Sequence, residues 1–267
     1  PFRRSPAVSR YGRGEWIHPG GSVKDRAALN IIRTAEESGQ LRPGMTIFDS
    51  TSGNTGIAFA MLGAARGYKV KLLAPDNVSP ERKAILRAYG AELILTDPLE
   101  GTDGALMEAR RMAAEDPSLF YAKQYDNDAN WRAHYLTTAC EIWWQTGGAI
   151  THFVAGTGTG GTFTGTTRRL RELKPTIRFI AGQPDSPFNA IEGWKHMPTA
   201  IKPAIYDESL ADEIVTASTE EAQEMARFLA RHEGIFVGVS AGAAVHSALR
   251  VAQRLEEGLV VTVLPDG

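Results

Sequence analysis

The stretch that decides the fold is Thr151-His152-Phe153-Val154-Ala155, followed at once by Gly156-Thr157-Gly158-Thr159-Gly160-Gly161-Thr162. Its first five residues form a short, mostly apolar run that is typical of a buried strand. Helical periodicity continues over residues 162–173, so a glycine-rich turn joins a strand to a helix. Such a unit is one half of a βαβ element, and it predicts a parallel sheet.

The same alternation runs along the rest of the chain and predicts an α/β fold with open, mostly parallel sheets. A polar cluster at 124–130 divides the chain into two α/β halves, and the long irregular stretch 183–212 is expected to carry function. The predicted strands are 46–49, 69–74, 92–96, 151–155, 178–183, 235–239 and 259–264. The predicted helices are 57–66, 80–89, 104–114, 134–145, 162–173, 219–232 and 241–256, besides one that opens near Lys24.

Composition excludes several classes of protein. The chain has 267 residues, a net charge of −2 and 43% hydrophobic residues, which is ordinary for a globular protein and unlike a nucleic-acid binder. No apolar run is long enough to span a membrane. Cys140 is the single cysteine and the histidines lack metal-site spacing, so we expect no disulfide, no metal and a reducing, cytoplasmic environment.

The N-terminal segment 1–14 is rich in Arg and Ser and contains no acidic residue. A leader of this composition resembles a transit peptide, but the chain does not begin with Met. We therefore expect the chain to be a fragment of a longer product, and we expect residues 1–14 to be poorly ordered.

Lys24 stands in line with the apolar side of its helix, because its neighbours at i+3, i+4, i+7, i+8 and i+11 are all apolar. A partly desolvated lysine at a helix start is suited to Schiff-base chemistry. The alternative is a lysine at a helix end that extends its ammonium group into water. The apolar neighbours are Ala27, Ala28, Ile31, Ile32 and Ala35.

The turn Thr51-Ser52-Gly53-Asn54-Thr55-Gly56 lies between a predicted strand and a helix. Two glycines allow a ligand to approach the backbone, and a helix N-terminus offers unpaired N–H groups. Four short polar side chains add donors that suit a carboxylate. The alternative is an ordinary capped turn, since Ser, Thr and Asn are favoured N-caps.

The turn 156–162 combines dense glycine with hydroxyls at a helix start, which predicts a phosphate-binding site. It is not a Walker A sequence, because no Gly-Lys-Ser/Thr follows. Gly156, Gly158 and Gly161 also match G-x-G-x-x-G, with Asp185 after the next strand. A dinucleotide-binding Rossmann protein therefore stays open as an alternative of a different class.

The sequence Gly238-Val239-Ser240-Ala241-Gly242 matches the nucleophile elbow G-x-S-x-G. A serine hydrolase would need an acid and then a histidine after this serine, but only His246 follows, with no acid between them. We therefore interpret Ser240 as a hydrogen-bonding group at a strand end or as an N-cap.

These motifs together resemble the cysteine synthase (O-acetylserine sulfhydrylase) family of pyridoxal phosphate (PLP) enzymes, which has the tryptophan-synthase-β-like fold. The resemblance covers about residues 15–267 and depends on four motifs in the family's order. They are Pro19-Gly20-Gly21-Ser22-Val23-Lys24-Asp25-Arg26, Thr51-Ser52-Gly53-Asn54-Thr55-Gly56, Gly158-Thr159-Gly160-Gly161-Thr162 and Gly238-Val239-Ser240-Ala241-Gly242.

The resemblance implies a role for each candidate site residue. Lys24 would carry PLP as a Schiff base and act as the base, Asn54 would bind the PLP 3′-hydroxyl, and Ser240 would face the pyridine nitrogen. The phosphate would be held by Gly158, Thr159, Gly160, Gly161 and Thr162, and the substrate carboxylate by Thr51, Ser52, Thr55 and Gln124.

The resemblance also implies the architecture and the reaction. It predicts two three-layer α/β domains with PLP in the cleft between them (fold type II). One is a smaller, mobile domain of residues 27–128 and the other a larger, PLP-anchoring domain of residues 1–26 plus 129–267. The reaction would be β-replacement through an aminoacrylate, which makes L-cysteine from an O-activated serine and a sulfide-type donor. O-acetylserine is the favoured O-activated serine.

Other partners and substrates follow from the same resemblance. We expect a homodimer whose active site docks the C-terminal tail of serine acetyltransferase. The stretch 188–206, with Lys195, also resembles members that take O-phosphoserine and a thiocarboxylated carrier protein, and cystathionine β-synthase shares the motifs. Two departures are that the family's N-terminal signature is absent and that the chain stops at Pro265-Asp266-Gly267.

Overall fold

The computed structural model describes residues 8–51 and 53–267. The chain divides into two compact units, which we call the smaller unit (residues 18–130) and the larger unit (residues 1–17 and 131–267). Residues 18–26 group with the smaller unit. The predicted domain ranges 27–128 and 1–26 plus 129–267, and the mobility of the smaller domain, stay predictions.

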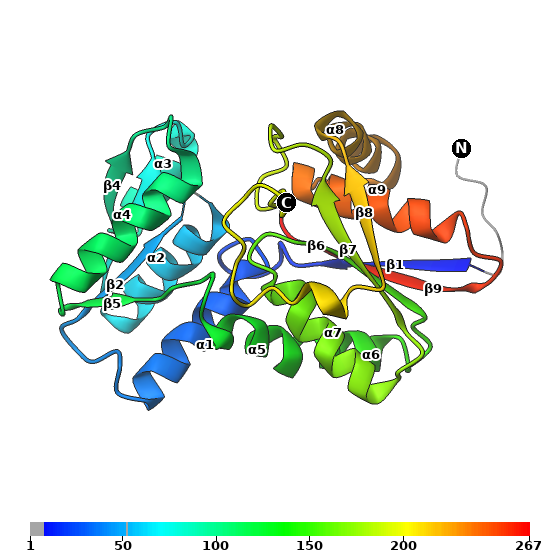
Figure 1. Ribbon diagram of the computed structural model, residues 1–267, viewed down its shortest axis with the longest axis horizontal. Coiled ribbons are helices and arrows are strands. Elements are labelled where there is room, and N and C mark those ends of the chain that lie inside the picture. The colour runs from blue at the N-terminus through cyan, green and yellow to red at the C-terminus, as the bar shows by residue number, and fades with distance from the viewer. Residues whose placement is uncertain (1–7, 52) are drawn as a thin grey trace. The chain divides into compact units, whose positions relative to one another are not determined.

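The smaller unit is built on a parallel sheet in the order β4-β3-β2-β5 (Figure 1). Its strands are β2 (Thr46–Ser50), β3 (Lys69–Pro75), β4 (Glu92–Thr96) and β5 (Leu119–Tyr121). Its helices are α1 (Lys24–Glu37), α2 (Asn54–Arg66), α3 (Pro80–Ala88) and α4 (Gly101–Glu115).

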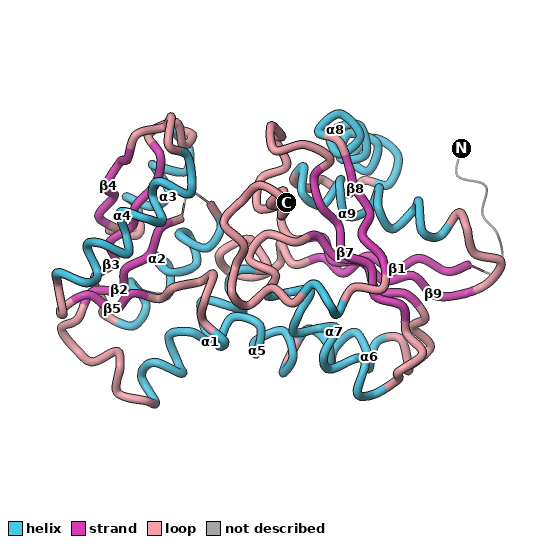
Figure 2. Tube along the Cα trace, in the orientation of Figure 1, coloured by secondary structure: helices cyan, strands magenta, loops and turns pink. Residues whose placement is uncertain are grey.

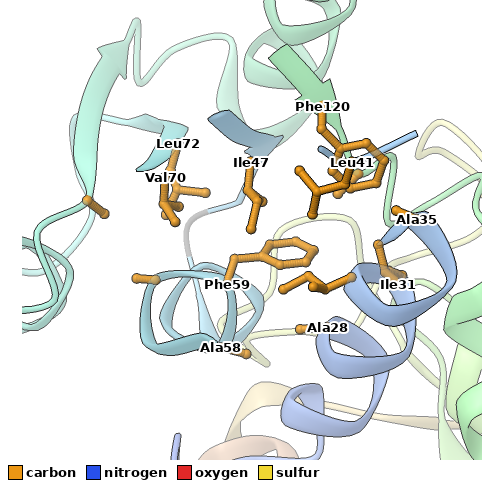
Figure 3. Close-up of a cluster of buried hydrophobic side chains, with 14 of the residues drawn as sticks. Ala28, Ile31, Ala35, Leu41, Ile47, Ala58, Phe59, Val70, Leu72 and Phe120 are labelled. Carbon is orange, nitrogen blue, oxygen red and sulfur yellow. The ribbon is translucent and has the colours of Figure 1, made fainter. Parts of the chain in front are cut away.

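Helices cover both faces of this sheet because its strands are apolar on both sides. Ile47 of β2 packs toward α1 and α2, whereas the next residue, Phe48, packs toward Ala109 of α4. Figure 3 shows the first face, where Phe59 of α2 points into the space bounded by Ile47 and by Ile31 of α1. The apolar stripe predicted next to Lys24 is buried in this core.

The larger unit is built on a second parallel sheet in the order β1-β9-β6-β7-β8. Its strands are β1 (Val8–Gly14), β6 (His152–Gly156), β7 (Arg178–Pro184), β8 (Glu213–Ala217) and β9 (Gly258–Leu264). The helices in this part of the chain are α5 (Asp128–Leu136), α6 (Thr138–Gln145), α7 (Gly161–Leu173), α8 (Thr219–Phe228) and α9 (Val239–Ala252), with the short turns η1 (Glu208–Leu210) and η2 (Leu229–Glu233).

Both faces of the second sheet are covered as well. Figures 1 and 2 show α8 and α9 on one face and α6 and α7 on the other. Val154 and Ile180 pack toward Val251 of α9, whereas the ring of Phe179 lies under the guanidinium of Arg171 of α7. The predicted α/β class with parallel sheets is therefore confirmed in both units.

Each sheet has one point where the strand order reverses. In the smaller unit the chain moves from β2 outward to β4 and then returns to place β5 on the other side of β2. In the larger unit it moves from β6 outward to β8 and then returns to place β9 beside β6. Loops at the carboxyl ends of the strands diverge at such switch points, which is where open parallel sheets bind ligands.

The expected strand at 235–239 is wrong. Gly234 has φ +69° and ends η2, and the residues after it hydrogen-bond to a helix end and to Asp266 instead of to a strand. Val237 packs beside Ala241 and Leu264. The apolar run therefore covers a helix without entering the sheet.

Two other expectations need correction. The helix expected at 134–145 is two helices, because Thr137 bonds back to the Ala133 carbonyl and departs from helical geometry. Residues 8–14 were expected to be poorly ordered, but they form strand β1, and residues 1–7 lie outside the described part. As an edge strand, β1 is largely exposed and shows no hydrophobic alternation.

Among residues 8–51 and 53–267, no helix has the length and apolar character needed to cross a membrane.

Candidate functional site

The β2–α2 turn (residues 51–56) lies at the switch point of the smaller unit. Thr51 and Thr55 are buried there, and Asn54 is half-buried as the first residue of α2. The Thr51 hydroxyl accepts a hydrogen bond from Gly53 N at 3.4 Å. Ser52, predicted to bind the substrate carboxylate, lies outside the described residues. The turn therefore brings three of the predicted polar side chains to one helix N-terminus.

Gln124 follows β5 and joins this turn from the other side of the switch point. The Thr55 hydroxyl donates to Gln124 Oε1 at 2.8 Å, and Gln124 Nε2 donates to the Ser50 carbonyl at 3.1 Å. Asn130 Nδ2 holds the Gln124 carbonyl at 2.7 Å. The structure thus brings together Gln124 and Thr55, two residues predicted to bind the same carboxylate.

Asp49 is the residue that the sequence interpretation missed in this region. It is fully buried in β2, where its Oδ1 accepts from Ser50 N at 2.9 Å and its Oδ2 accepts from Gln124 N at 3.2 Å. Burial raises the pKa of its carboxyl group to about 7, although both hydrogen bonds act to lower it. The available signal was a charged residue inside the buried strand Ile47-Phe48-Asp49.

Lys24 is the first residue of α1, and its side chain is half-buried. The Ser22 hydroxyl accepts a hydrogen bond from Lys24 N at 3.2 Å, while Asp25 accepts one from Gly20 N at 2.6 Å. These bonds fix the backbone that carries the lysine. Lys24 therefore belongs to the same unit as Asn54 and Gln124, and an amine of this kind can form a Schiff base with an aldehyde.

The β6–α7 turn (residues 156–162) lies at the switch point of the larger unit, and close packing determines its shape. A Cβ atom at Gly158 would lie 1.8 Å from the Gly193 carbonyl oxygen. Gly160 has φ +87°, and a Cβ there would lie 2.7 Å from Tyr206 Cβ. Only glycine fits at these two positions, so the close packing of residues 193 and 206 fixes the path of the turn backbone.

Hydroxyl groups complete this turn. Thr159 Oγ1 accepts from Gly161 N at 3.3 Å, and Thr162 Oγ1 lies 3.4 Å from His134 Nε2. His134 is buried, and its Nδ1 lies 2.9 Å from Thr138 Oγ1. The first turn of α7 contains no acidic residue.

The irregular stretch after β7 packs onto the β6–α7 turn. Lys195 N donates to the Thr157 carbonyl at 2.9 Å, and the Trp194 ring fills the space in front of Gly156. The Thr164 hydroxyl bonds the Ile205 carbonyl at 3.1 Å. Residues 193–195 and 205–206 therefore pack against this turn and the start of α7, and the Lys195 side chain is half-buried.

Ser240 lies in the first turn of α9, and it donates a hydrogen bond to Asp266 Oδ1 at 3.0 Å. Asp266 follows β9, the strand on the far side of the β6 switch point. Residues 235–238 are not a strand, so the strand–turn–helix context of a nucleophile elbow is lacking around Ser240. Its hydroxyl donates to a carboxylate instead of to a histidine.

The donors present fit PLP. The β6–α7 turn offers glycine-lined backbone at a helix N-terminus, two hydroxyls and no acid, which suits a phosphate monoester. In the smaller unit Lys24 has the amine that Schiff-base formation with an aldehyde requires, and in the larger unit Ser240 has a hydroxyl that can hydrogen-bond. Within the described part of the chain, no cluster of His, Cys, Asp and Glu has the geometry of a metal site.

Comparison with known proteins adds independent information. The model of a family described as pyridoxal-phosphate dependent enzyme matches residues 1–266. The chain is 51% identical over 265 residues to a cysteine synthase of Aquifex aeolicus, covering 97% of this chain and 81% of the relative.

Two solved structures are also similar to this chain. A cysteine synthase of Entamoeba histolytica superposes with a TM-score of 0.92 at 38% identity, covering 97% of this chain and 79% of that one. An O-ureido-L-serine synthase superposes with a TM-score of 0.93 at 40% identity, covering 100% of this chain and 86% of that one.

Proposed function

Because this chain belongs to the cysteine synthase family of pyridoxal-phosphate-dependent enzymes, we propose that it makes L-cysteine from O-acetylserine and a sulfide-type donor by β-replacement. The observation that carries the proposal is the glycine-lined β6–α7 turn, which has the chemistry of a phosphate site in a chain similar to cysteine synthases. The G-x-G-x-x-G match is then part of a PLP-binding turn, and the dinucleotide alternative is not needed.

The cofactor is PLP, and we propose a role for each candidate ligand residue in turn. Gly158, Thr159, Gly160, Gly161 and Thr162 would bind the phosphate through backbone N–H groups and hydroxyls. Asn54 would bind the 3′-hydroxyl and Ser240 the pyridine nitrogen. Since Ser240 donates its own proton to Asp266, its oxygen can only accept, so it would pair with the ring nitrogen in the protonated N–H form.

The substrate would be held and deprotonated by the smaller unit. Thr51, Ser52, Thr55 and Gln124 would bind its carboxylate, and the hydrogen bonds around Gln124 support that role. Bound PLP supplies an electron sink for negative charge at the substrate Cα. Lys24 Nζ would attach the cofactor in the resting enzyme and, once released, take the proton from Cα, after which acetate leaves Cβ.

The test is cysteine formation by the purified chain with bound PLP. With sulfide present, O-acetylserine should give L-cysteine at least about 10-fold faster than O-phosphoserine or serine. Faster turnover of O-phosphoserine would instead support the alternative that takes O-phosphoserine. Faster turnover of serine with homocysteine would support the cystathionine β-synthase alternative. A colourless protein that retains NAD and forms no cysteine would contradict the proposal.

We also propose that the chain acts as a cytoplasmic homodimer and binds the C-terminal tail of a serine acetyltransferase at the carboxylate site. The tail ends in a carboxylate, which is the group that the β2–α2 turn is suited to bind. Sedimentation equilibrium tests the dimer. Competition between a tail peptide and O-acetylserine tests the docking.

A further inference from the structure

A fully buried carboxyl group lies directly behind the β2–α2 turn and is not one of the residues assigned to substrate or cofactor. Asp49 is 0% exposed, and both of its oxygens accept backbone hydrogen bonds, from Ser50 N at 2.9 Å and from Gln124 N at 3.2 Å. The first bond holds Ser50, the residue before Thr51, and the second bond holds the backbone of Gln124. One side chain therefore joins the two segments that meet at this switch point.

The segment that carries Gln124 needs such a contact. Lys123 is the single non-glycine residue with positive φ, at 52°, among residues 8–51 and 53–267. That conformation costs about 1 kcal/mol for a residue with a side chain. The Asp49–Gln124 bond is one of the contacts that hold the strained backbone, and Gln124 then reaches Thr55 Oγ1 at 2.8 Å.

We propose that Asp49 is a positioning residue for substrate, and that its ionised carboxylate aligns Gln124 and the β2–α2 turn for binding a carboxylate. This inference rests on the proposed function, since it assumes that the turn binds the substrate. Asp49 itself is buried and touches no substrate. It acts through the backbone N–H groups of Ser50 and Gln124.

Protonation of Asp49 would disturb this arrangement. Each of its oxygens accepts from a backbone N–H, so protonation of either oxygen would make it a weaker acceptor and weaken one of the two hydrogen bonds. Burial raises the pKa of Asp49 to about 7, which places this change within the range accessible to assays. Substrate affinity should therefore rise as pH increases through 7.

The groups that face Asp49 are few. Asp126 acts on it with like charge and is itself paired with Arg110 Nη2 at 3.1 Å. Tyr121 and Tyr125 also lie within its field, and burial raises the pKa of both phenols, with Asp103 adding to the effect at Tyr125. Both tyrosines therefore stay neutral between pH 6 and 8, so of these three groups it is the Asp49 carboxyl whose charge changes in that range.

The experiment measures competitive inhibition of the PLP-loaded enzyme by propionate against O-acetylserine between pH 6 and 8. Propionate carries the carboxylate without an amine, so it reports on the carboxylate site alone. For the unaltered chain we expect the inhibition constant to fall about 10-fold between pH 6 and 8, because the ionised fraction of Asp49 rises by about that factor. Asp49→Asn should bind propionate at least about 10-fold more weakly at pH 8, without a pH dependence, and its PLP affinity should be unchanged.

Asp126→Asn is the matched control, because it removes the neighbouring charge and leaves both Asp49 hydrogen bonds intact. It should keep a pH dependence of similar size, with the midpoint moved to lower pH, because the Asp126 charge helps to raise the pKa of Asp49. A pH-independent inhibition constant in the unaltered chain overturns the inference even if Asp49→Asn fails to fold, and so does an Asp49→Asn variant that matches the unaltered chain. Absence of PLP binding and of cysteine formation in the unaltered chain is a different result, which overturns the proposed function together with the inference.

Discussion

The two switch points of this molecule have the same topology but are stabilised in different ways. At the β6–α7 turn, steric packing sets the geometry, since a side chain at Gly158 or Gly160 would overlap with Gly193 or Tyr206. At the β2–α2 turn, hydrogen bonds set the geometry, through Asp49, Gln124 and Thr55. Among the described residues, the neighbour that a Cβ at Gly53 would meet is Arg82 Nη1, at 3.8 Å.

This difference fits the roles proposed for the two turns, cofactor binding at the β6–α7 turn and substrate binding at the β2–α2 turn. A turn fixed by packing is insensitive to pH and suits a cofactor that stays bound. A turn held by a hydrogen-bond network that includes a buried carboxyl can respond to protons and suits a substrate that enters and leaves. Holding an ionisable group in a fully buried position costs stability, which is a common feature of functional sites.

The largest effect should come from Gly158→Ala. Because the added Cβ would lie 1.8 Å from the backbone oxygen of Gly193, the turn must shift, and we expect PLP affinity to fall by about 100-fold or more. Equilibrium dialysis of PLP measures it. Gly53→Ala is the matched control in the other turn and should leave PLP affinity within about 2-fold. Equal losses in both variants would remove the contrast between the turns.

The second-largest effect should be on the free energy of unfolding. The folded pKa of Asp49 is about 7, against an ordinary value of 3.8, so the folded state binds the extra proton between these values. The free energy of unfolding should therefore fall as pH rises, by about 2–3 kcal/mol between pH 5 and 8 from this group. Asp49→Asn should lack that part of the slope. Urea unfolding at the two pH values measures it, and identical slopes in both proteins would refute the assignment.

A smaller effect is expected for Thr55→Val, which keeps the shape of the side chain and removes the hydroxyl that bonds Gln124 Oε1. We expect the KM for O-acetylserine to rise about 10-fold, which corresponds to the loss of one buried hydrogen bond. The PLP affinity of the same variant should not change. A fall in PLP affinity with an unaltered KM would reverse the roles of the two turns.

The smallest effect should follow Asp266→Asn at the larger unit's switch point. The amide can still contact Ser240, but it no longer enforces donation from the serine hydroxyl. We expect a change in kcat of about 3-fold and a shift of the PLP absorbance band. Leu255→Met, at a partly buried position in the core of the same unit, is a control that should show neither change. An unchanged spectrum in Asp266→Asn would show that Asp266 does not influence the ring through Ser240.

Much of the fold could be predicted from the sequence. Strands such as β4 and β6 are short apolar runs that end in turn residues, and the stripe beside Lys24 had helical spacing. The failures have physical causes. The edge strand β1 has no apolar alternation because water covers most of it. In the run 235–238, Ile235 and Val237 pack on a helix while Phe236 is exposed, an alternation that local patterns do not distinguish from a strand.

The candidate site was predicted in part, for a similar reason. Glycines and hydroxyls that stand together in sequence, as in residues 156–162, reveal a turn directly. Asp49 and Gln124 are far apart in sequence and meet because β5 returns beside β2. Asp266 and Ser240 meet because β9 returns beside β6. Contacts made by strand order cannot be read from local patterns, so Asp49 and Asp266 were missed.

The most direct test of the central claim is to locate the covalent bond between cofactor and protein. Borohydride reduction of the PLP-loaded chain, followed by proteolysis and mass spectrometry, identifies the modified lysine. We predict that the phosphopyridoxyl group lies on Lys24, and that Lys24→Ala keeps its fold but forms no cysteine from O-acetylserine and sulfide. Modification of another lysine such as Lys195, or undiminished cysteine synthesis by Lys24→Ala, would contradict it.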